Sequence, residues 1–266
     1  MGNRNIKLIL AYDGSGYAGW QRLKEEDRKR SVQSVLEETI SLVLQEEIKI
    51  TGSGRTDKGV HAIGQAANFK CHKNIAPQKM LAAINQALPE DIRVMELSEV
   101  PMDFHSRKSA AAKTYEYRFE IDEVPSVFLR KYVYAIPEEP DIPAMEKAAK
   151  FLMGTHDFRA YSAEKREDYD TVRRIDKLLI EPVTVKGCQR ESKQIKLLIT
   201  GNGFLYNMVR IIAGTLLEVG QHKREPEDMK RILDSRRREN AGIKVPPEGL
   251  YLREVTFPVE INFKIK

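Results

Sequence analysis

The sequence has little of the residue types that build metal centres and disulfide frameworks. It contains two cysteines, Cys71 and Cys188, and five histidines among 266 residues. Neither cysteine belongs to a Cys-x-x-Cys pair, and no spacing of cysteines and histidines matches a zinc site. We therefore expect neither a bound metal nor a disulfide-stabilised fold.

Long hydrophobic runs are also missing. Residues 1–5 lead directly into a strand pattern without an apolar signal core, and no stretch approaches the length of a membrane span. Hydrophobic residues make up 41% of the chain and charged residues 31%, which is typical of a soluble protein with its own core. We expect a cytoplasmic protein with no membrane partner.

Two glycine-rich segments come close to nucleotide-binding motifs. Gly14, Gly16 and Gly19 satisfy the spacing of the dinucleotide fingerprint, but residues 20–22 continue as Trp-Gln-Arg instead of opening a helix. Residues 52–59 lack the second glycine of a P-loop and the Ser or Thr after its lysine. A nucleotide-binding regulator is therefore not supported, and we expect no cofactor.

Positive charge is in slight excess, with 44 Lys and Arg against 39 Asp and Glu, a net charge of +5. This balance permits a nucleic-acid partner without demanding one. Basic residues also gather in short groups, any of which is compatible with an ordinary solvated surface. Together these seven groups favour contacts with a phosphate backbone: residues 28–30, 107–108, 130–131, 165–166, 173–174, 223–224 and 236–238.

The hydrophobic pattern of the first hundred residues predicts the order β-α-β-β-α-β. Strands are expected over residues 6–12, 48–52, 66–71 and 92–97, where apolar residues alternate or form short runs. Ser31 is a suitable N-cap for a helix that continues to residue 44, and Pro77 suits the first turn of a second helix. This order is that of a ferredoxin-like unit with a mainly antiparallel sheet.

The second half shows a similar order of elements without a sequence repeat. Strands are expected at residues 114–119, 177–180, 194–200 and 250–255, and helices at 143–152, 206–219 and 226–233. We place the domain boundary near residues 101–108. The predicted domains are residues 1–105 and residues 106–266.

Residues 54–61, Gly-Arg-Thr-Asp-Lys-Gly-Val-His, place one carboxylate between two cationic side chains in a glycine-flanked loop. Arg55 and Lys58 are expected to keep Asp57 ionised, because a nearby opposite charge lowers the pKa of a carboxyl. An ionised aspartate without a second acid beside it suits a nucleophile. The alternative interpretation is a hairpin turn, since Gly, Thr and Asp are common turn residues.

The octet resembles the active-site signature of the tRNA pseudouridine synthase A family, which acts on the anticodon arm of transfer RNA. In that family the loop usually reads Gly-Arg-Thr-Asp-Ala-Gly-Val-His, and its Asp is catalytic. The resemblance extends from about residue 6 to residue 255. Further segments follow the family pattern in order: residues 12–21, 31–33, 104–110, 113–117, 154–158, 204–210 and 249–252.

This resemblance implies an α+β fold of two ferredoxin-like halves, with antiparallel sheets related by a pseudo-twofold and an RNA cleft between them. It implies a homodimeric isomerase that binds tRNA and converts uridine to pseudouridine in the anticodon stem-loop, at positions 38, 39 and 40. The first predicted domain would carry the catalytic aspartate, and the second would carry the base-stacking tyrosine and the arginine that pairs with the aspartate.

The resemblance also implies roles for individual residues. Asp57 corresponds to the nucleophile, and Tyr115 to the tyrosine that stacks on the target base and is a candidate for proton transfer at C5. Arg210 corresponds to the arginine that pairs with the aspartate, Leu250 to the leucine beside the base, and Arg55 to the residue that occupies the vacated stack. From the residues alone, Arg210 could equally be a helix-surface arginine, and Leu250 an ordinary core leucine.

The chain departs from the family pattern at Lys58, where alanine is usual, at Lys108, where an aromatic residue is common, and at Tyr161. Two alternatives to the anticodon-arm enzyme stay open, the first because of these differences. One is a paralogue that modifies another tRNA position or ribosomal RNA. The other is a non-catalytic RNA-binding protein of the same fold.

Overall fold

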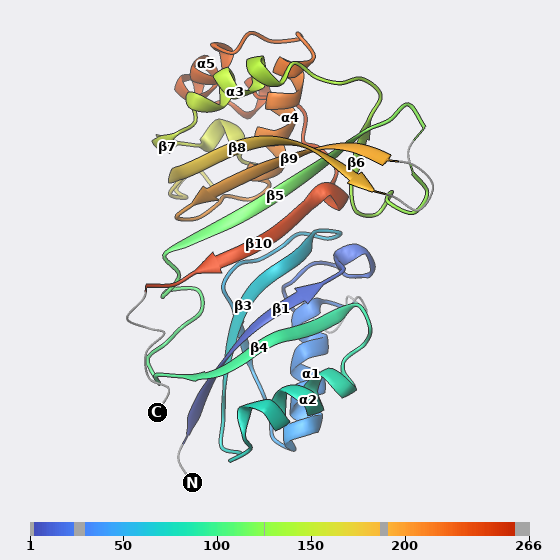
Figure 1. Cartoon of the computed structure of the whole chain (residues 1–266). Helices are drawn as coiled ribbons and strands as arrows, with labels where there is room; N and C mark the ends of the chain where they lie inside the picture. Colours follow the sequence, from blue (N-terminus) through green and yellow to red (C-terminus); the bar gives the residue numbers. More distant parts are fainter. Residues whose placement is uncertain (1–2, 24–29, 125, 187–190, 259–266) are drawn as a thin grey trace. The chain divides into compact units, whose positions relative to one another are not determined.

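The computed structural model describes residues 3–23, 30–124, 126–186 and 191–258 (Figure 1). Arg28 and Lys29 of the first basic group, and Cys188, lie outside these residues. The chain divides into two compact units. The first unit comprises residues 1–113 together with 251–266, and the second comprises residues 114–250.

The first unit has the predicted order β-α-β-β-α-β, followed by a strand from the end of the chain. Its elements are β1 (Arg4–Tyr12), α1 (Val32–Leu44), β2 (Ile50–Gly52), β3 (His61–Cys71), α2 (Pro77–Ala87), β4 (Ile92–Val100) and β10 (Leu250–Thr256). β1 lies between β3 and β4 and is antiparallel to both. β2 is antiparallel to one end of β3, and β10 is parallel to the other end.

Local sequence signals explain these elements. Ile6, Leu8 and Leu10 alternate along β1 and are fully buried, as a strand with one face on a core requires. Ser31 accepts a hydrogen bond from the backbone of Ser34 and forms the predicted cap of α1. The apolar side of α1 and Met80 and Ile84 of α2 complete the core of this unit.

The second unit has a sheet in the order β5-β9-β8-β7, with β6 parallel to β5. α4 is buried along almost its whole length and packs against α3, which also contacts β8. Short 3-10 turns occur at Gly14–Gly16, Arg159–Tyr161, Arg238–Asn240 and Pro247–Gly249. The elements of this unit are β5 (Ala112–Ile121), β6 (Tyr134–Ile136), α3 (Ile142–Lys150), β7 (Gly154–Asp157), β8 (Val172–Lys186), β9 (Glu191–Gly201), α4 (Met208–Gly220) and α5 (Asp228–Ser235).

The predicted α+β class with mainly antiparallel pairing is confirmed. In the second unit the observed strands β8 and β9 are longer than predicted, the short strands β6 and β7 were not predicted, and α4 begins at Met208 instead of residue 206. The last strand lies in the first unit from Tyr251 onward, whereas the predicted division at residues 105 and 106 assigns it to the second half. Two independently folding domains and the pseudo-twofold remain predictions.

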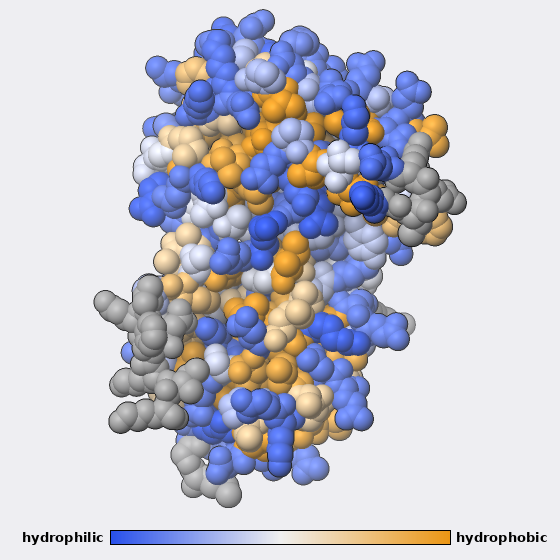
Figure 2. All heavy atoms as spheres, viewed as in Figure 1, coloured by the Kyte–Doolittle hydropathy of each residue, from blue (hydrophilic) through white to orange (hydrophobic). Residues whose placement is uncertain are grey.

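Hydrophilic residues cover much of the visible face of each unit, and hydrophobic residues form patches among these hydrophilic residues (Figure 2). No helix in the described part of the chain is long and apolar enough to cross a membrane.

Candidate active site

Asp57 lies in the loop that connects β2 to β3. The backbone N–H of Val60 donates to the carbonyl of Asp57 at 3.1 Å, which closes a tight turn over residues 57–60. Gly59 has a φ of +79°, the left-handed value that the third position of a type II turn requires. The glycine therefore allows the chain to reverse directly after the carboxylate. The turn interpretation and the catalytic one are compatible, because a turn presents Asp57.

Hydrogen bonds to buried groups hold this loop in place. The hydroxyl of Tyr12 on β1 lies 2.7 Å from Oγ1 of Thr56, and both side chains are buried. Burial raises the pKa of the Tyr12 hydroxyl, so this group stays neutral at physiological pH. The backbone N–H of Trp20 donates to the carbonyl of Thr56 at 3.0 Å. The residue before Asp57 is thus held at its side chain and at its carbonyl.

The N-terminal glycine segment packs against the same loop. Gly19 has a φ of +111°, and a Cβ placed there would lie 2.6 Å from the carbonyl oxygen of Thr56. A Cβ on Gly14 would lie 2.0 Å from the carbonyl oxygen of Val60. Two of the three glycines that resemble a dinucleotide fingerprint therefore serve close backbone packing against the Asp57 loop.

His61, the last residue of the octet, fixes the end of the loop. Its ring is buried and stacks on Tyr251 of β10 with ring centroids 4.8 Å apart. Its Nδ1 accepts a hydrogen bond from the backbone N–H of Gly14 at 3.1 Å and lies 3.2 Å from the Asp13 carboxylate. Neither Asp13 nor Tyr251 was singled out from the sequence as a partner of His61.

The charged side chains of the loop differ in exposure. Arg55 and Lys58 are exposed, and Asp57 is half-buried. Exposed cations at these positions can meet an RNA phosphate or base. The expectation that they keep Asp57 ionised stays a prediction.

Tyr115 lies on β5 in the second unit. It is 7% exposed, and its ring meets Phe204 edge to face with centroids 5.0 Å apart. Phe204 follows β9 and belongs to one of the segments that resemble the family. Tyr117 is fully buried and donates to the carbonyl of Pro246 at 2.8 Å, which confirms its interpretation as a core aromatic.

Arg210 is buried in the first turn of α4 and is 8% exposed. The alternative of a helix-surface arginine is therefore wrong. Its Nε donates to the carbonyl of Val245 at 2.8 Å, and one terminal nitrogen donates to Oδ1 of Asn207 at 3.0 Å. These two partners fix the plane of the guanidinium. Sequence reasoning missed them, because Val245 is far along the chain and Asn207 looks like an ordinary helix residue.

Leu250 begins β10 and is 6% exposed. The preceding Gly249 packs tightly, since a Cβ there would lie 2.8 Å from both the carbonyl oxygen of Arg118 and the Tyr117 ring. Asp57 and Arg55 belong to the first unit, and Tyr115, Arg210 and Leu250 belong to the second. Their assembly into one site is part of the proposal made below.

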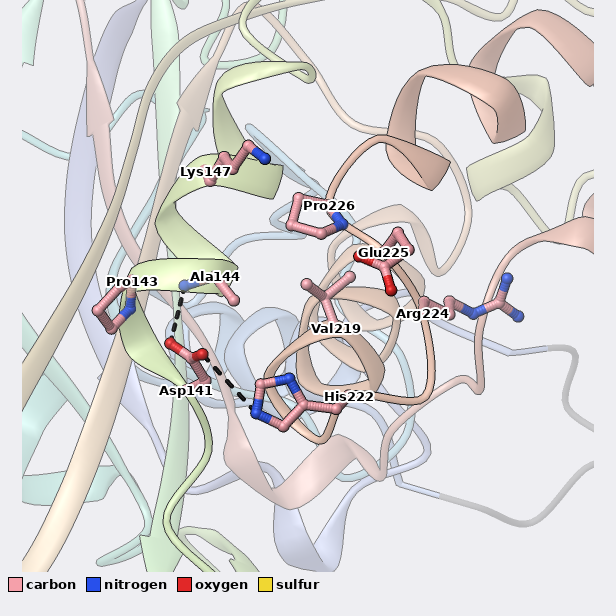
Figure 3. A pocket seen from close by; sticks show the side chains of 9 residues that line it. All are labelled: Asp141, Pro143, Ala144, Lys147, Val219, His222, Arg224, Glu225 and Pro226. Carbon is pink, nitrogen blue, oxygen red and sulfur yellow. Dashed lines mark hydrogen bonds and ion pairs between the residues drawn. The ribbon is translucent and has the colours of Figure 1, made fainter.

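A surface pocket of about 370 Å³ lies elsewhere, beside the start of α3 and the segment between α4 and α5 (Figure 3). The Asp141 carboxylate accepts from the backbone N–H of Ala144 and pairs with His222 at 3.7 Å. None of the predicted site residues lines this pocket. Among the residues that the structure describes, no group of three His, Cys, Asp or Glu side chains is arranged to hold a metal ion.

A family model described as tRNA pseudouridine synthase matches residues 8–107 and 148–258. The protein named tRNA pseudouridine synthase A 2 of Clostridium tetani (strain Massachusetts / E88) is 43% identical over 254 residues, which cover 96% of this chain and 99% of that protein. The tRNA pseudouridine synthase A of Caldicellulosiruptor bescii is 41% identical over 254 residues, with coverage of 96% and 100%. That of Anoxybacillus flavithermus is 43% identical over 255 residues, with coverage of 96% and 99%. This chain belongs to the tRNA pseudouridine synthase family.

Proposed function

We propose that this protein isomerises uridine to pseudouridine in the anticodon stem-loop of tRNA, at positions 38, 39 and 40, with Asp57 as the nucleophile. Family membership supports the reaction and the tRNA substrate. The observation that supports Asp57 is its placement. A half-buried carboxylate stands on a tight turn whose neighbouring residue, Thr56, is anchored to the core.

The reaction breaks the N1–C1′ glycosidic bond, turns the uracil, and rejoins it through C5, from which a proton is lost. It needs a nucleophile, a site that retains the detached base, and a base for the C5 proton. No redox or phosphoryl-transfer step occurs, so the proposal assigns no metal or cofactor. Attack by Asp57 at C1′, attack on the uracil ring and a glycal route all fit the placement of this carboxylate.

We assign Tyr115 to the target base. Stacking of an extruded base on an aromatic ring typically contributes about 1–3 kcal/mol. The edge-to-face contact with Phe204 restrains the Tyr115 ring, so little of this stabilisation is spent on ordering it. Tyr115 is also the candidate that moves the C5 proton, and Leu250 supplies apolar contact beside the base.

We assign Arg210 to the carboxylate of Asp57. A guanidinium carries five N–H donors, so the bonds to Val245 and Asn207 fix its plane without exhausting its capacity. An arginine held in this way can donate two parallel N–H hydrogen bonds to a carboxylate. A carboxylate beside a buried guanidinium offsets the cost of burying its charge, which is the physical reason for the assignment.

We assign the exposed Arg55 to the gap that the target uridine leaves. Extrusion of a stacked base costs a few kcal/mol. Arginine can stack in the vacated space and contact phosphate at the same time. We further propose that the enzyme works as a cytoplasmic homodimer and that Lys58 adds a phosphate contact beside Asp57.

The test of the catalytic assignment is Asp57→Asn, assayed by tritium release from C5-labelled uridine in tRNA and by RNA binding. Asn is as good a turn former as Asp, so the loop should persist. We expect release to vanish while binding is kept or slightly strengthened, because a negative charge near RNA is lost. Substantial release by this variant would overturn the assignment of Asp57.

Mapping of pseudouridines in cellular RNA, with and without the gene, tests the target. Loss of pseudouridine at tRNA positions 38, 39 and 40 supports the proposal. Loss at other tRNA or ribosomal RNA positions would identify a paralogue with a different target. An unchanged map would favour a non-catalytic RNA-binding protein.

A further inference from the structure

We infer that Lys113 is a positioning residue for the loop that carries Asp57. Its Nζ donates to the carbonyl of Ser53 at 2.6 Å, at the point where β2 has ended and the loop begins. This inference rests on the role proposed for Asp57, because a held loop matters to the reaction only if the loop carries the nucleophile.

The backbone of the loop is held by a short series of donors. The carbonyls of Ser53, Gly54 and Thr56 accept hydrogen bonds, and their donors come from three separate places. These donors are Nζ of Lys113, Nε2 of Gln65 on β3 at 2.8 Å, and the backbone N–H of Trp20. Among these three donors, the ammonium of Lys113 is the charged one. Charge-assisted hydrogen bonds are shorter and roughly twice as strong as neutral ones, so Lys113 supplies the strongest of these anchors.

Ser53 depends on its backbone for this anchoring. Its side chain is fully buried, and Oγ has no hydrogen-bond partner among the described residues. Its N–H donates to the carbonyl of Ala66 at 2.8 Å, and its carbonyl accepts from Lys113. Loss of the Lys113 bond would leave a buried carbonyl to find another donor, and a shift of residues 53–57 is the available response.

Burying the Lys113 ammonium beside another cation costs free energy, which argues that the residue has a function at this position. Burial, together with the nearby Arg107, lowers the pKa of Lys113 to about 8. Among the described residues, Arg107 is the charged group that acts on it, and no carboxylate forms an ion pair with it. Lys113 also precedes Tyr115 by two residues on β5, so the same strand continues to the residue proposed to stack on the target base.

The variant Lys113→Met removes the donor, and Lys113→Arg keeps a donor that stays charged. We expect Lys113→Met to lower kcat by about tenfold or more, the loss that corresponds to one charge-assisted hydrogen bond. KM should change little, because Lys113 bonds a protein carbonyl. Lys113→Arg should recover a large part of kcat. Lys49→Met is the matched control, since Lys49 is exposed and stands one residue before β2.

Two readouts follow the loop without reference to activity. Amide hydrogen exchange of residues 54–58 should accelerate in Lys113→Met. The fluorescence of Trp20, the single tryptophan of the chain, should change too, because Trp20 bonds to Thr56 and its indole packs on Gly52. Asp57→Asn measured in parallel separates the two proposals, since a failure of the catalytic assignment leaves these loop readouts intact.

The pH dependence of the wild-type enzyme provides a further test of the role of Lys113. As Lys113 loses its proton near pH 8, kcat should fall and loop exchange should rise beyond the general increase of amide exchange with pH. Both changes should be absent from Lys113→Arg over the same range. This comparison remains available if Lys113→Met fails to fold. Wild-type kcat together with wild-type loop exchange in Lys113→Met, or an identical alkaline limb in Lys113→Arg, would overturn the inference.

Discussion

Gly19 can pack closely against the loop that carries Asp57 because it has no Cβ. Its φ of +111° and its approach to the carbonyl of Thr56 leave no room for a Cβ. We expect Gly19→Ala to lower the free energy of unfolding by about 1–3 kcal/mol and to reduce tritium release, because the loop below Asp57 must move. Gly16→Ala is the control, since no heavy atom lies within 4 Å of a Cβ at that position. Denaturant unfolding and the tritium assay measure both effects, and equal behaviour of the two variants would contradict the packing argument.

Arg210 shows how a buried charge can be tested by substitution. On the pairing with Asp57 proposed above, we expect Arg210→Ala to reduce kcat strongly while binding of tRNA is largely kept, because removal of one partner of a buried pair costs on the order of 3–5 kcal/mol. Asp57 should then remain protonated to higher pH, which moves the acidic limb of the activity profile toward alkaline pH. Arg210→Lys should recover little, since an ammonium cannot reproduce the fork of donors. Wild-type turnover of Arg210→Ala would show that the two groups act separately.

The stability of the protein should also depend on Lys113 in a direction that can be worked out. The unfolded chain keeps this proton up to a pKa near 10.5, and the folded protein releases it near 8. Between these values the unfolded state binds more protons, so the contribution of Lys113 to stability rises with pH in this window and is least favourable below pH 8. The difference in unfolding midpoint between Lys113→Met and wild type should therefore favour the variant more at pH 7 than at pH 10. A difference that is independent of pH would contradict this.

At the scale of elements, α4 illustrates what the sequence could and could not predict. The apolar run after residue 203 indicates a buried helix correctly, yet the helix begins at Met208, because Asn207 has a φ of +60°. A left-handed residue cannot belong to the helix, and its side chain bonds Arg210 instead. We expect Asn207→Ala to destabilise the protein by about 1–2 kcal/mol more than Asn207→Gly, since glycine adopts this conformation freely. Both variants lose the bond to Arg210, so comparable losses of kcat should accompany unequal losses of stability.

The pairing of strands that are far apart in the sequence could not be predicted. The first unit was predicted in its element order because alternation, a serine cap and a proline at the first helical turn are local signals. The parallel pairing of β10 with β3 is a contact between distant parts of the chain, and it brings Tyr251 onto His61. Periodicity carries no information on such partners. The same reason explains why the octet was found from the sequence while the bonds of Arg210 to Val245 and of Lys113 to Ser53 were not.

At the scale of the whole molecule, the proposed dimer is tested by mass. Light scattering at micromolar concentration should give twice the chain mass of 30.5 kDa. A concentration series distinguishes a stable dimer from one that forms on tRNA, and the same measurement with added tRNA covers the second case. A mass of 30.5 kDa without tRNA, together with one protein chain in each complex with tRNA, would contradict the proposal.

RNA binding should be electrostatic, but with fewer cations than the composition suggests. Arginines of the predicted basic groups are partly neutralised in place, as Arg166 pairs with Glu164 at 2.9 Å and Arg236 with Asp157 at 3.2 Å. The exposed Lys108 is a better candidate for a phosphate contact.

The logarithm of the affinity should fall linearly with the logarithm of salt concentration, by about 0.7–0.9 for each phosphate contact. Lys108→Gln should reduce the slope by one such contact, whereas Lys49→Gln, which removes an equal charge next to β2, should leave it unchanged. Because the slope counts contacts, equal slopes for wild type and Lys108→Gln would remove Lys108 from the RNA interface, and a salt-independent affinity would rule out phosphate recognition as the main source of binding.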